Sequence, residues 1–371
     1  MKIAILTQPL HNNYGGLLQA FALQHHLKNQ GHDVLTVDFS CNRKPRFFGI
    51  KSIIGNVVRK YVLRRPLKSI FPVTDQQKRA IGQHTNRFTA EHIRTTQAIH
   101  SVKEFTYIKQ YQFDAYVVGS DQVWRPEYSP GMQAFFLDFL GDDASIKRVS
   151  YAASFGLDHC DEFSQNELDN YSRLLQRFDA ISVRENSAVT LCREHFGVEA
   201  SHVIDPTMLL EKNDYCRLVE RDNSPISNGN MMVYVLDQSP EKQSIINNVA
   251  TARGLKPYTV MPESNGVYPP VTQWLRGFMD AEYVVTDSFH GVVFSIIFNK
   301  QFIAIGNPGR GLARFTSLLN MFALEDRLIS NINQLNEQLI NKQINFSHVN
   351  DVLNQQKQFA EKFINDVLVV R

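Results

Sequence analysis

The segment with the clearest chemical potential spans residues 283–291, with the sequence YVVTDSFHG. Its apolar run predicts a strand ending at Thr286, followed by a tight loop and a helix that begins near Gly291. Ligand sites form at the carboxyl ends of such strands, and a helix N-terminus offers N–H groups and a positive dipole end to phosphate. His290 could donate a proton or a hydrogen bond to a bound anion there. Alternatively, Asp287 or Ser288 only caps the helix and His290 packs against it.

A second candidate lies in residues 178–186 (FDAISVREN), where Arg184 ends an apolar strand and Glu185 opens the next helix. A guanidinium at this place could grip a carboxylate or a phosphate with two parallel hydrogen bonds. The alternative is an Arg184–Glu185 pair that only holds a domain junction together.

A third candidate spans residues 117–126 (VVGSDQVWRP), where a strand ends in Gly-Ser-Asp. Asp121 could act as a base for a sugar hydroxyl, and Trp124 could stack on a sugar face. Equally, Ser120 or Asp121 could cap a helix above a buried Trp124.

Three loops carry weaker signals. Residues 12–16 (NNYGG) lack the dinucleotide pattern GxGxxG but would let a ligand approach the backbone closely. Residues 205–207 (DPT) end another strand in a turn that faces the predicted cleft. Residues 306–311 (GNPGRG) could place Arg310, and Arg314 one turn further on, near a phosphate. The combined candidates favour a small phosphorylated anion bound without a metal.

These segments sit in an alternation of strands and helices that predicts two doubly wound α/β domains facing a cleft. We expect an N-terminal Rossmann-like domain over residues 1–178 and a C-terminal one over 179–345, with a final helix in 346–371 that packs back on the N-terminal domain. The expected strands are 2–6, 34–39, 115–118, 148–153, 180–183, 202–204, 231–236, 257–260, 283–286 and 302–305. The expected helices include 17–30, 164–177, 241–253, 271–279, 291–298, 312–321 and 348–368.

Composition limits the class of protein. The 371 residues are 43% hydrophobic and 20% charged with a net charge of +2, so no global field marks a nucleic-acid binder. The four cysteines show no CxxC pair, and we expect reduced thiols in a reducing compartment. The N-terminus lacks a signal-peptide pattern and no apolar run reaches about 20 residues, which favours a cytoplasmic location.

An insertion at residues 41–73 interrupts the pattern with basic and apolar side chains and no acid. Its stretch 43–68 suits peripheral contact with the inner face of a membrane, where a lipid-linked acceptor would be met. The alternative is a solvated helical insertion.

Six motifs in order resemble the polysaccharide pyruvyltransferase family. They are residues 13–16 (NYGG) with 18–20 (LQA), 118–124 (VGSDQVW), 151–156 (YAASFG), 182–185 (SVRE), 205–207 (DPT) and 286–291 (TDSFHG). The resemblance implies two Rossmann-like domains arranged as in GT-B glycosyltransferases, phosphoenolpyruvate as donor, and a glycan or lipid-linked glycan precursor as acceptor. It implies no cofactor and the formation of a cyclic ketal on a sugar.

The resemblance places Arg184 and His290 at donor-binding or catalytic positions, and we add Asp121 as a catalytic group. The full expected sites are Arg184, Ser288, His290, Gly291, Arg310 and Arg314 for the donor, and Asn13, Tyr14, Gly15, Ser120, Asp121 and Trp124 for the acceptor. Some family members carry an Arg where this chain has Ser288, so we expect either that another cation, such as Arg310 or Arg314, takes its place or that the donor is bound differently.

Two other functions stay open at this stage. One is a nucleotide-sugar glycosyltransferase, which the same two-domain cleft would suit. The other is a non-catalytic protein that binds anions or glycans.

Overall fold

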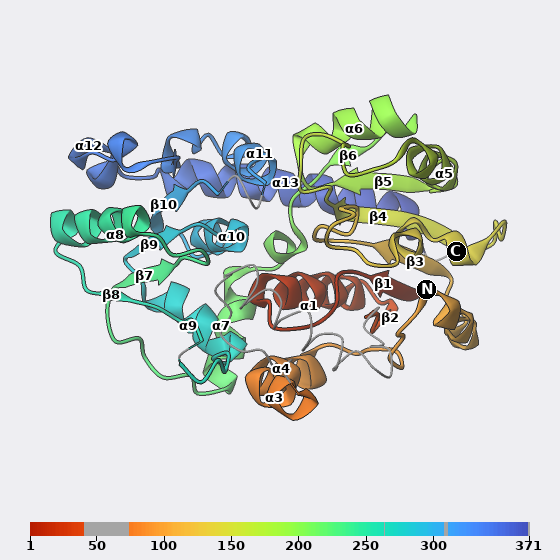
Figure 1. The fold of residues 1–371 in the computed structure, drawn as a ribbon, viewed down its shortest axis with the longest axis horizontal. Coiled ribbons are helices and arrows are strands. Elements are labelled where there is room, and N and C mark those ends of the chain that lie inside the picture. Colours follow the sequence, from red (N-terminus) through yellow and green to blue (C-terminus); the bar gives the residue numbers. More distant parts are fainter. Residues whose placement is uncertain (41–73, 263, 308–310, 370–371) are drawn as a thin grey trace, which may run out of the picture.

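The computed structural model describes residues 1–40, 74–262, 264–307 and 311–369. The predicted insertion at 41–73, including the stretch 43–68, lies outside the described residues, as does Arg310. In the described part, two parallel sheets are each accompanied by helices, which confirms the predicted fold class (Figure 1).

The first sheet has six strands in the order β2-β1-β3-β4-β5-β6, all parallel. Its strands are β1 (Lys2–Leu6), β2 (Asp33–Thr36), β3 (Ala115–Val118), β4 (Lys147–Ala153), β5 (Ala180–Val183) and β6 (Ser201–His202). Its helices are α1 (Tyr14–Asn29), α3 (Asp75–Ile81), α4 (Gln83–His92), α5 (Gln165–Leu175) and α6 (Asn186–Phe196).

The second sheet has five parallel strands in the order β11-β10-β9-β7-β8. They are β7 (Met231–Tyr234), β8 (Pro257–Tyr258), β9 (Tyr283–Thr286), β10 (Gln301–Ile305) and β11 (Leu328–Ile329). The helices of this half are α7 (Lys212–Arg221), α8 (Pro240–Arg253), α9 (Val271–Asp280), α10 (Phe289–Ile297), α11 (Ala313–Met321) and α12 (Glu337–Asn341).

The predicted division at residues 178 and 179 falls inside the first sheet. β5 and β6 follow that point in the chain, yet β5 pairs with β4 and β6 pairs with β5. The first sheet therefore extends through His202. The prediction failed because a domain boundary depends on strand pairing, which the alternation of apolar runs does not specify.

Two helices join the halves. The long helix α13 (Phe346–Val367) runs from the second half back across the first (Figure 1), and its Leu353 and Ala360 share a hydrophobic cluster with Tyr151 of β4. At the start of α1, the Tyr14 ring stacks on Trp274 of α9 at 5.5 Å, and its hydroxyl donates to the Pro269 carbonyl at 2.9 Å. These contacts fix the spacing between the two carboxyl edges.

Helix α10 begins two residues earlier than the sequence pattern predicts. It starts at Phe289, so His290 lies in its first turn, and every residue of the helix is buried. An apolar helix between two sheets needs no polar face, which is why its pattern gives no periodicity from which to set its start. None of the described helices is both long and apolar enough to cross a membrane.

Candidate active site

A cavity of about 590 Å³ lies where the carboxyl edges of the two sheets face each other. The first half contributes loop residues after β1 and β3, and the second half contributes the loop after β9 with the first turns of α10 and α11. Its predicted members are Asn13, Gly15, Asp121, Ser288, His290 and Arg314; further lining residues include Gln8, His11, Tyr128, Tyr268 and Phe289. Side chains far apart in sequence thus meet at one site.

Behind the cavity wall, a chain of buried charges links the two halves. Arg184 ion-pairs with Asp121 at 3.2 Å and with Asp205 at 2.9 Å. The same Asp205 oxygen lies 3.6 Å from His290 Nε2, and the other oxygen accepts two hydrogen bonds from Thr207. The order Asp121–Arg184–Asp205–His290 therefore connects β3, β5, the loop after β6, and α10.

These contacts keep both carboxyl groups ionised. Burial alone would raise the pKa of Asp121, but the Arg184 guanidinium, with His290 and Arg314, holds that pKa below its usual range. For Asp205, His290, Arg184 and the Thr207 N–H likewise outweigh burial and hold the pKa well below its usual range. A carboxylate whose pKa is lowered is a weak base and therefore a poor proton acceptor. Asp121 is thus better suited to accepting a hydrogen bond than to removing a proton.

Arg184 does not occupy the place predicted for it. Its side chain is 1% exposed, does not line the cavity, and is taken up by two carboxylates. Glu185, predicted as an alternative partner, instead accepts hydrogen bonds from Ser154 Oγ and the Phe155 and Gly156 N–H groups. Burial raises the pKa of Glu185 against the opposing effect of Arg184.

Arg314 is the described arginine that reaches the cavity. It comes from α11, and its guanidinium lies 5.5 Å from the Phe289 ring, which also contacts Arg184 at 4.7 Å. Burial, and then the like charge of Arg184, lower the pKa of Arg314 to about 10, so the group is still cationic at neutral pH.

The loop between β9 and α10 is held by Asp287 rather than by a helix cap. Asp287 is fully buried and accepts hydrogen bonds from the N–H groups of Leu236 and Asp237 and from Lys242 Nζ. Ser288 occupies the N-cap position of α10 without a side-chain cap bond, and its side chain lines the cavity. Neither side chain therefore caps α10, which was the alternative function of Asp287 or Ser288. The sequence pattern does not indicate the contact with Lys242.

Two glycines permit the packing of His290 and its helix. A Cβ on Gly15 would lie 2.0 Å from His290 Nδ1, so the imidazole rests on the backbone of α1. A Cβ on Gly291 would lie 2.1 Å from Thr286 Oγ1, so Gly291 allows α10 to approach β9, and it is not among the residues that line the cavity.

Three predicted acceptor residues lie in the protein interior and do not line the cavity. Trp124 is 0% exposed, donates its indole N–H to the Phe135 carbonyl and stacks on Phe136. Ser120 is also fully buried and donates to the Ala152 carbonyl, and Tyr14 joins the two halves as described above. For Trp124 the alternative of a buried aromatic holds, because the loop after β3 turns its apolar side chains inward.

The arrangement defines a two-domain α/β protein with a site between its sheets, and solved structures align with it over most of the chain. The Staphylococcus aureus MnaA–UDP co-structure aligns at TM-score 0.50 and 11% identity, covering 99% of this chain and 96% of that one. UDP-GlcNAc 2-epimerase from Neisseria meningitidis bound to UDP-GlcNAc aligns at TM-score 0.48 and 9% identity, over 98% and 100%. Acinetobacter baumannii MurG aligns at 0.47 and 10%, over 100% and 99%.

The sequence identifies the family. Residues 13–309 match the model of the family described as polysaccharide pyruvyl transferase, and the chain belongs to this family. The predicted resemblance is therefore confirmed. Membership of this family supports a transferase that moves pyruvate to polysaccharide. No curated protein sequence matches the chain. Among the described residues, no group of three or more His, Cys, Asp or Glu side chains is arranged to hold a metal ion.

Proposed function

We propose that this protein transfers the enolpyruvyl carbons of phosphoenolpyruvate to two hydroxyls of one sugar, forming a cyclic ketal and releasing phosphate. The observation that carries the proposal is the convergence of Arg314, His290 and Asp121 on one cavity in a chain of the pyruvyl transferase family. The donor is placed against the second half and a glycan or lipid-linked glycan acceptor against the first.

For the donor, the cavity supplies a cation and a helix N-terminus. Arg314 would pair with the carboxylate or the phosphate, taking the role that the sequence assigned to Arg184. The N–H groups of the first turn of α10, beginning at Phe289, would receive the remaining anionic group beside Ser288. Positive charge is therefore provided from two directions.

For the proton transfers, His290 is the suited group because it lines the cavity and the buried Asp205 carboxylate, 3.6 Å from its Nε2, would stabilise the protonated ring. Nε2 lies toward Asp205 and Nδ1 packs against the backbone of Gly15, which lines the cavity together with His290. A protonated His290 would give its proton to the methylene carbon of phosphoenolpyruvate, making the adjacent carbon electrophilic. The first sugar hydroxyl then bonds to that carbon, and its proton returns to His290.

The second half of the reaction closes the ring. The bond to phosphate breaks, the second hydroxyl bonds to the same carbon, and its proton leaves with the phosphate. Asp121 would accept a hydrogen bond from an acceptor hydroxyl and orient it, while Asn13 and the backbone at Gly15 complete that side of the cavity.

The test begins with thermal unfolding in the presence of phosphoenolpyruvate or of uridine diphosphate. A ligand at 100 times its Kd stabilises the native state by about 2.7 kcal/mol, which is roughly 3 °C for a chain of this length. We expect a shift with phosphoenolpyruvate that Arg314→Gln removes and that Arg193→Gln, on the exposed face of α6, retains. A shift with uridine diphosphate alone would instead support a nucleotide-sugar glycosyltransferase.

Turnover is measured as phosphate released from phosphoenolpyruvate with a panel of methyl glycosides and glycan precursors, with the ketal product identified by mass. We expect His290→Gln to lower kcat by about 100- to 10,000-fold without loss of folding. Binding of phosphoenolpyruvate without phosphate release for any acceptor would favour the non-catalytic alternative.

Contact of residues 43–68 with a membrane belongs to the same proposal, because a lipid-linked acceptor is met at a surface. Sedimentation with anionic liposomes at low salt checks it, and a protein that stays in the supernatant would refute it.

A further inference from the structure

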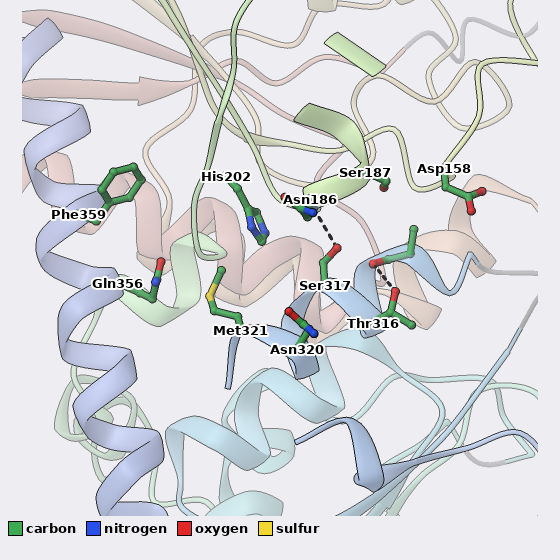
Figure 2. A pocket seen from close by; sticks show the side chains of 11 residues that line it. Asp158, Asn186, Ser187, His202, Thr316, Ser317, Asn320, Met321, Gln356 and Phe359 are labelled. Atoms are coloured by element: carbon green, nitrogen blue, oxygen red, sulfur yellow. Dashed lines mark hydrogen bonds between the residues drawn. The ribbon is translucent and has the colours of Figure 1, made fainter. Parts of the chain in front are cut away.

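A second cavity, of about 860 Å³, lies beside α11 (Figure 2), on another face of this helix than the cavity of the candidate active site. Thr316, Ser317 and Asn320 of α11 line it, whereas Arg314 and Phe315 of the same helix line the catalytic cavity. The start of α6, His202 of β6 and the side of α13 form the remaining walls. Its volume falls within the usual range of about 300–1,000 Å³ for small-molecule sites.

The lining of this second cavity is polar but almost uncharged. Hydroxyls and amides come from Asn186, Ser187, Thr316, Ser317, Asn320 and Gln356. Asp158 is its one charged residue, and neither a lysine nor an arginine belongs to the described lining. A phosphate or a carboxylate would find no counter-charge here, so the chemistry favours a neutral ligand with many hydroxyl groups.

Several polar atoms face this cavity with hydrogen-bonding capacity left over. His202 Nε2 lies 3.0 Å from the Arg184 carbonyl, which can only accept, so Nε2 carries the proton. Burial lowers the pKa of His202, and the neutral ring therefore keeps an acceptor at Nδ1. Ser317 Oγ accepts from the Asn186 N–H and retains its own proton to donate.

One wall offers an apolar surface. Phe359 of α13 is 48% exposed, one of the few large apolar side chains so open, and it borders the cavity with Met321 (Figure 2). An aromatic ring beside amides and hydroxyls is suited to a sugar, which presents C–H groups on one face and hydroxyls at its edge.

We propose that this second cavity is a binding site for an uncharged saccharide. This inference extends the proposed function. It rests on that function in one respect, that the natural ligand is a glycan. The sugar would lie on Phe359, donate a hydroxyl to His202, and exchange hydrogen bonds with Gln356 and Ser317. Because His202 holds the carbonyl of Arg184 and α11 carries Arg314, the occupied cavity adjoins the backbone that positions both cations.

The experiment is calorimetric titration of the full chain with maltotriose, cellotriose, mannotriose and the trimer of N-acetylglucosamine. Gln356 lines the cavity whereas the neighbouring Gln355 is exposed and does not, which gives a matched pair on one helix. We expect at least one trisaccharide to bind, with Kd raised about three- to tenfold by Gln356→Ala and about tenfold by Phe359→Ala. Gln355→Ala should bind as the wild type does.

Two results would overturn the proposal: no trisaccharide binds, or Gln356→Ala and Phe359→Ala bind as tightly as Gln355→Ala. The phosphoenolpyruvate shift is recorded on the same samples, so a missing donor response is distinguished from a missing saccharide site. The source of the sugar follows from adding phosphoenolpyruvate. If the bound trisaccharide becomes pyruvylated, the second cavity holds a part of the acceptor that is remote from the reacting sugar. If it stays unmodified, the cavity holds a separate glycan ligand. Either result supports the site.

Discussion

The contact between Gly15 and His290 gives the sharpest test of the site. Gly15 lies in the first turn of α1, where replacing glycine by alanine ordinarily stabilises a helix by about 0.5–1 kcal/mol. Here the new Cβ would lie 2.0 Å from His290 Nδ1 and 2.2 Å from Cγ, both of them ring atoms. Since carbon atoms pack at about 3.5–4.0 Å, the imidazole must move by more than 1 Å or rotate away.

We therefore expect Gly15→Ala to lose activity without a matching loss of folding. A displacement of about 1 Å in a reacting group costs on the order of 100-fold in rate, so kcat should fall by at least about that factor. The assay is phosphate release from phosphoenolpyruvate with the acceptor found in the glycoside panel, beside urea unfolding of the same samples.

The neighbouring glycine provides the control. The three atoms nearest to a Cβ on Gly16 all belong to the Asn13 side chain, at 3.0–3.5 Å, a contact that a shift of a few tenths of an ångström relieves. Gly16→Ala should keep kcat within about threefold of the wild type, well short of the loss expected at Gly15. If Gly15→Ala turned over as fast as Gly16→Ala, the position of His290 would not matter and its proton-transfer role would be refuted.

Three further changes test the buried groups. Asp205→Asn places an amide donor against Arg184 or Thr207 whichever way it is turned, and should lower the free energy of unfolding by about 3 kcal/mol in urea; a loss below about 1 kcal/mol would contradict a buried ion chain. Lys242→Met removes the ammonium partner of the buried Asp287 and should destabilise by a similar amount, because the carboxylate keeps only two backbone donors. Burial lowers the pKa of His26 from 6.5 to about 4, so the unfolded chain binds its proton first and stability should fall by up to about 3 kcal/mol as pH drops through that window. His26→Leu should flatten this part of the profile of unfolding free energy against pH. An unchanged slope would contradict the role of His26 in the loss of stability.

Much of the architecture follows from local patterns in the sequence. Apolar runs of four to seven residues flanked by glycine and polar loops correspond to strands such as Tyr283–Thr286, because strands of parallel sheets are buried on both faces. The loops that follow them converge since the carboxyl ends of parallel strands share an edge, which is why Asp121, Ser288 and His290 meet in one cavity.

The roles of single site residues could not be predicted from the sequence, because they depend on which groups face each other in the folded chain. The pattern of residues 205–207 (DPT) predicts a turn facing the cleft, and the structure shows in addition that Asp205 lies between Arg184 and His290. Trp124 stands beside Asp121 in the sequence, but its side chain enters the core while Asp121 faces the cavity. Residue type marks both as candidates, and only the path of the loop after β3 separates them.

The two buried arginines show why neighbouring charges and position decide a role that residue type leaves open. Arg184 is neutralised by Asp121 and Asp205, so a substrate anion placed near it would compete with carboxylates already in contact. Arg314 lines the cavity although it too is buried, and burial together with the like charge of Arg184 lowers its pKa. An arriving anion relieves exactly these two costs, because it pairs with the guanidinium and offsets the repulsion from Arg184. Under the proposed function, the same reasoning accounts for Ser288 at the position where the family resemblance leads one to expect an arginine, since the cation would reach the donor from α11 instead of from the N-cap of α10.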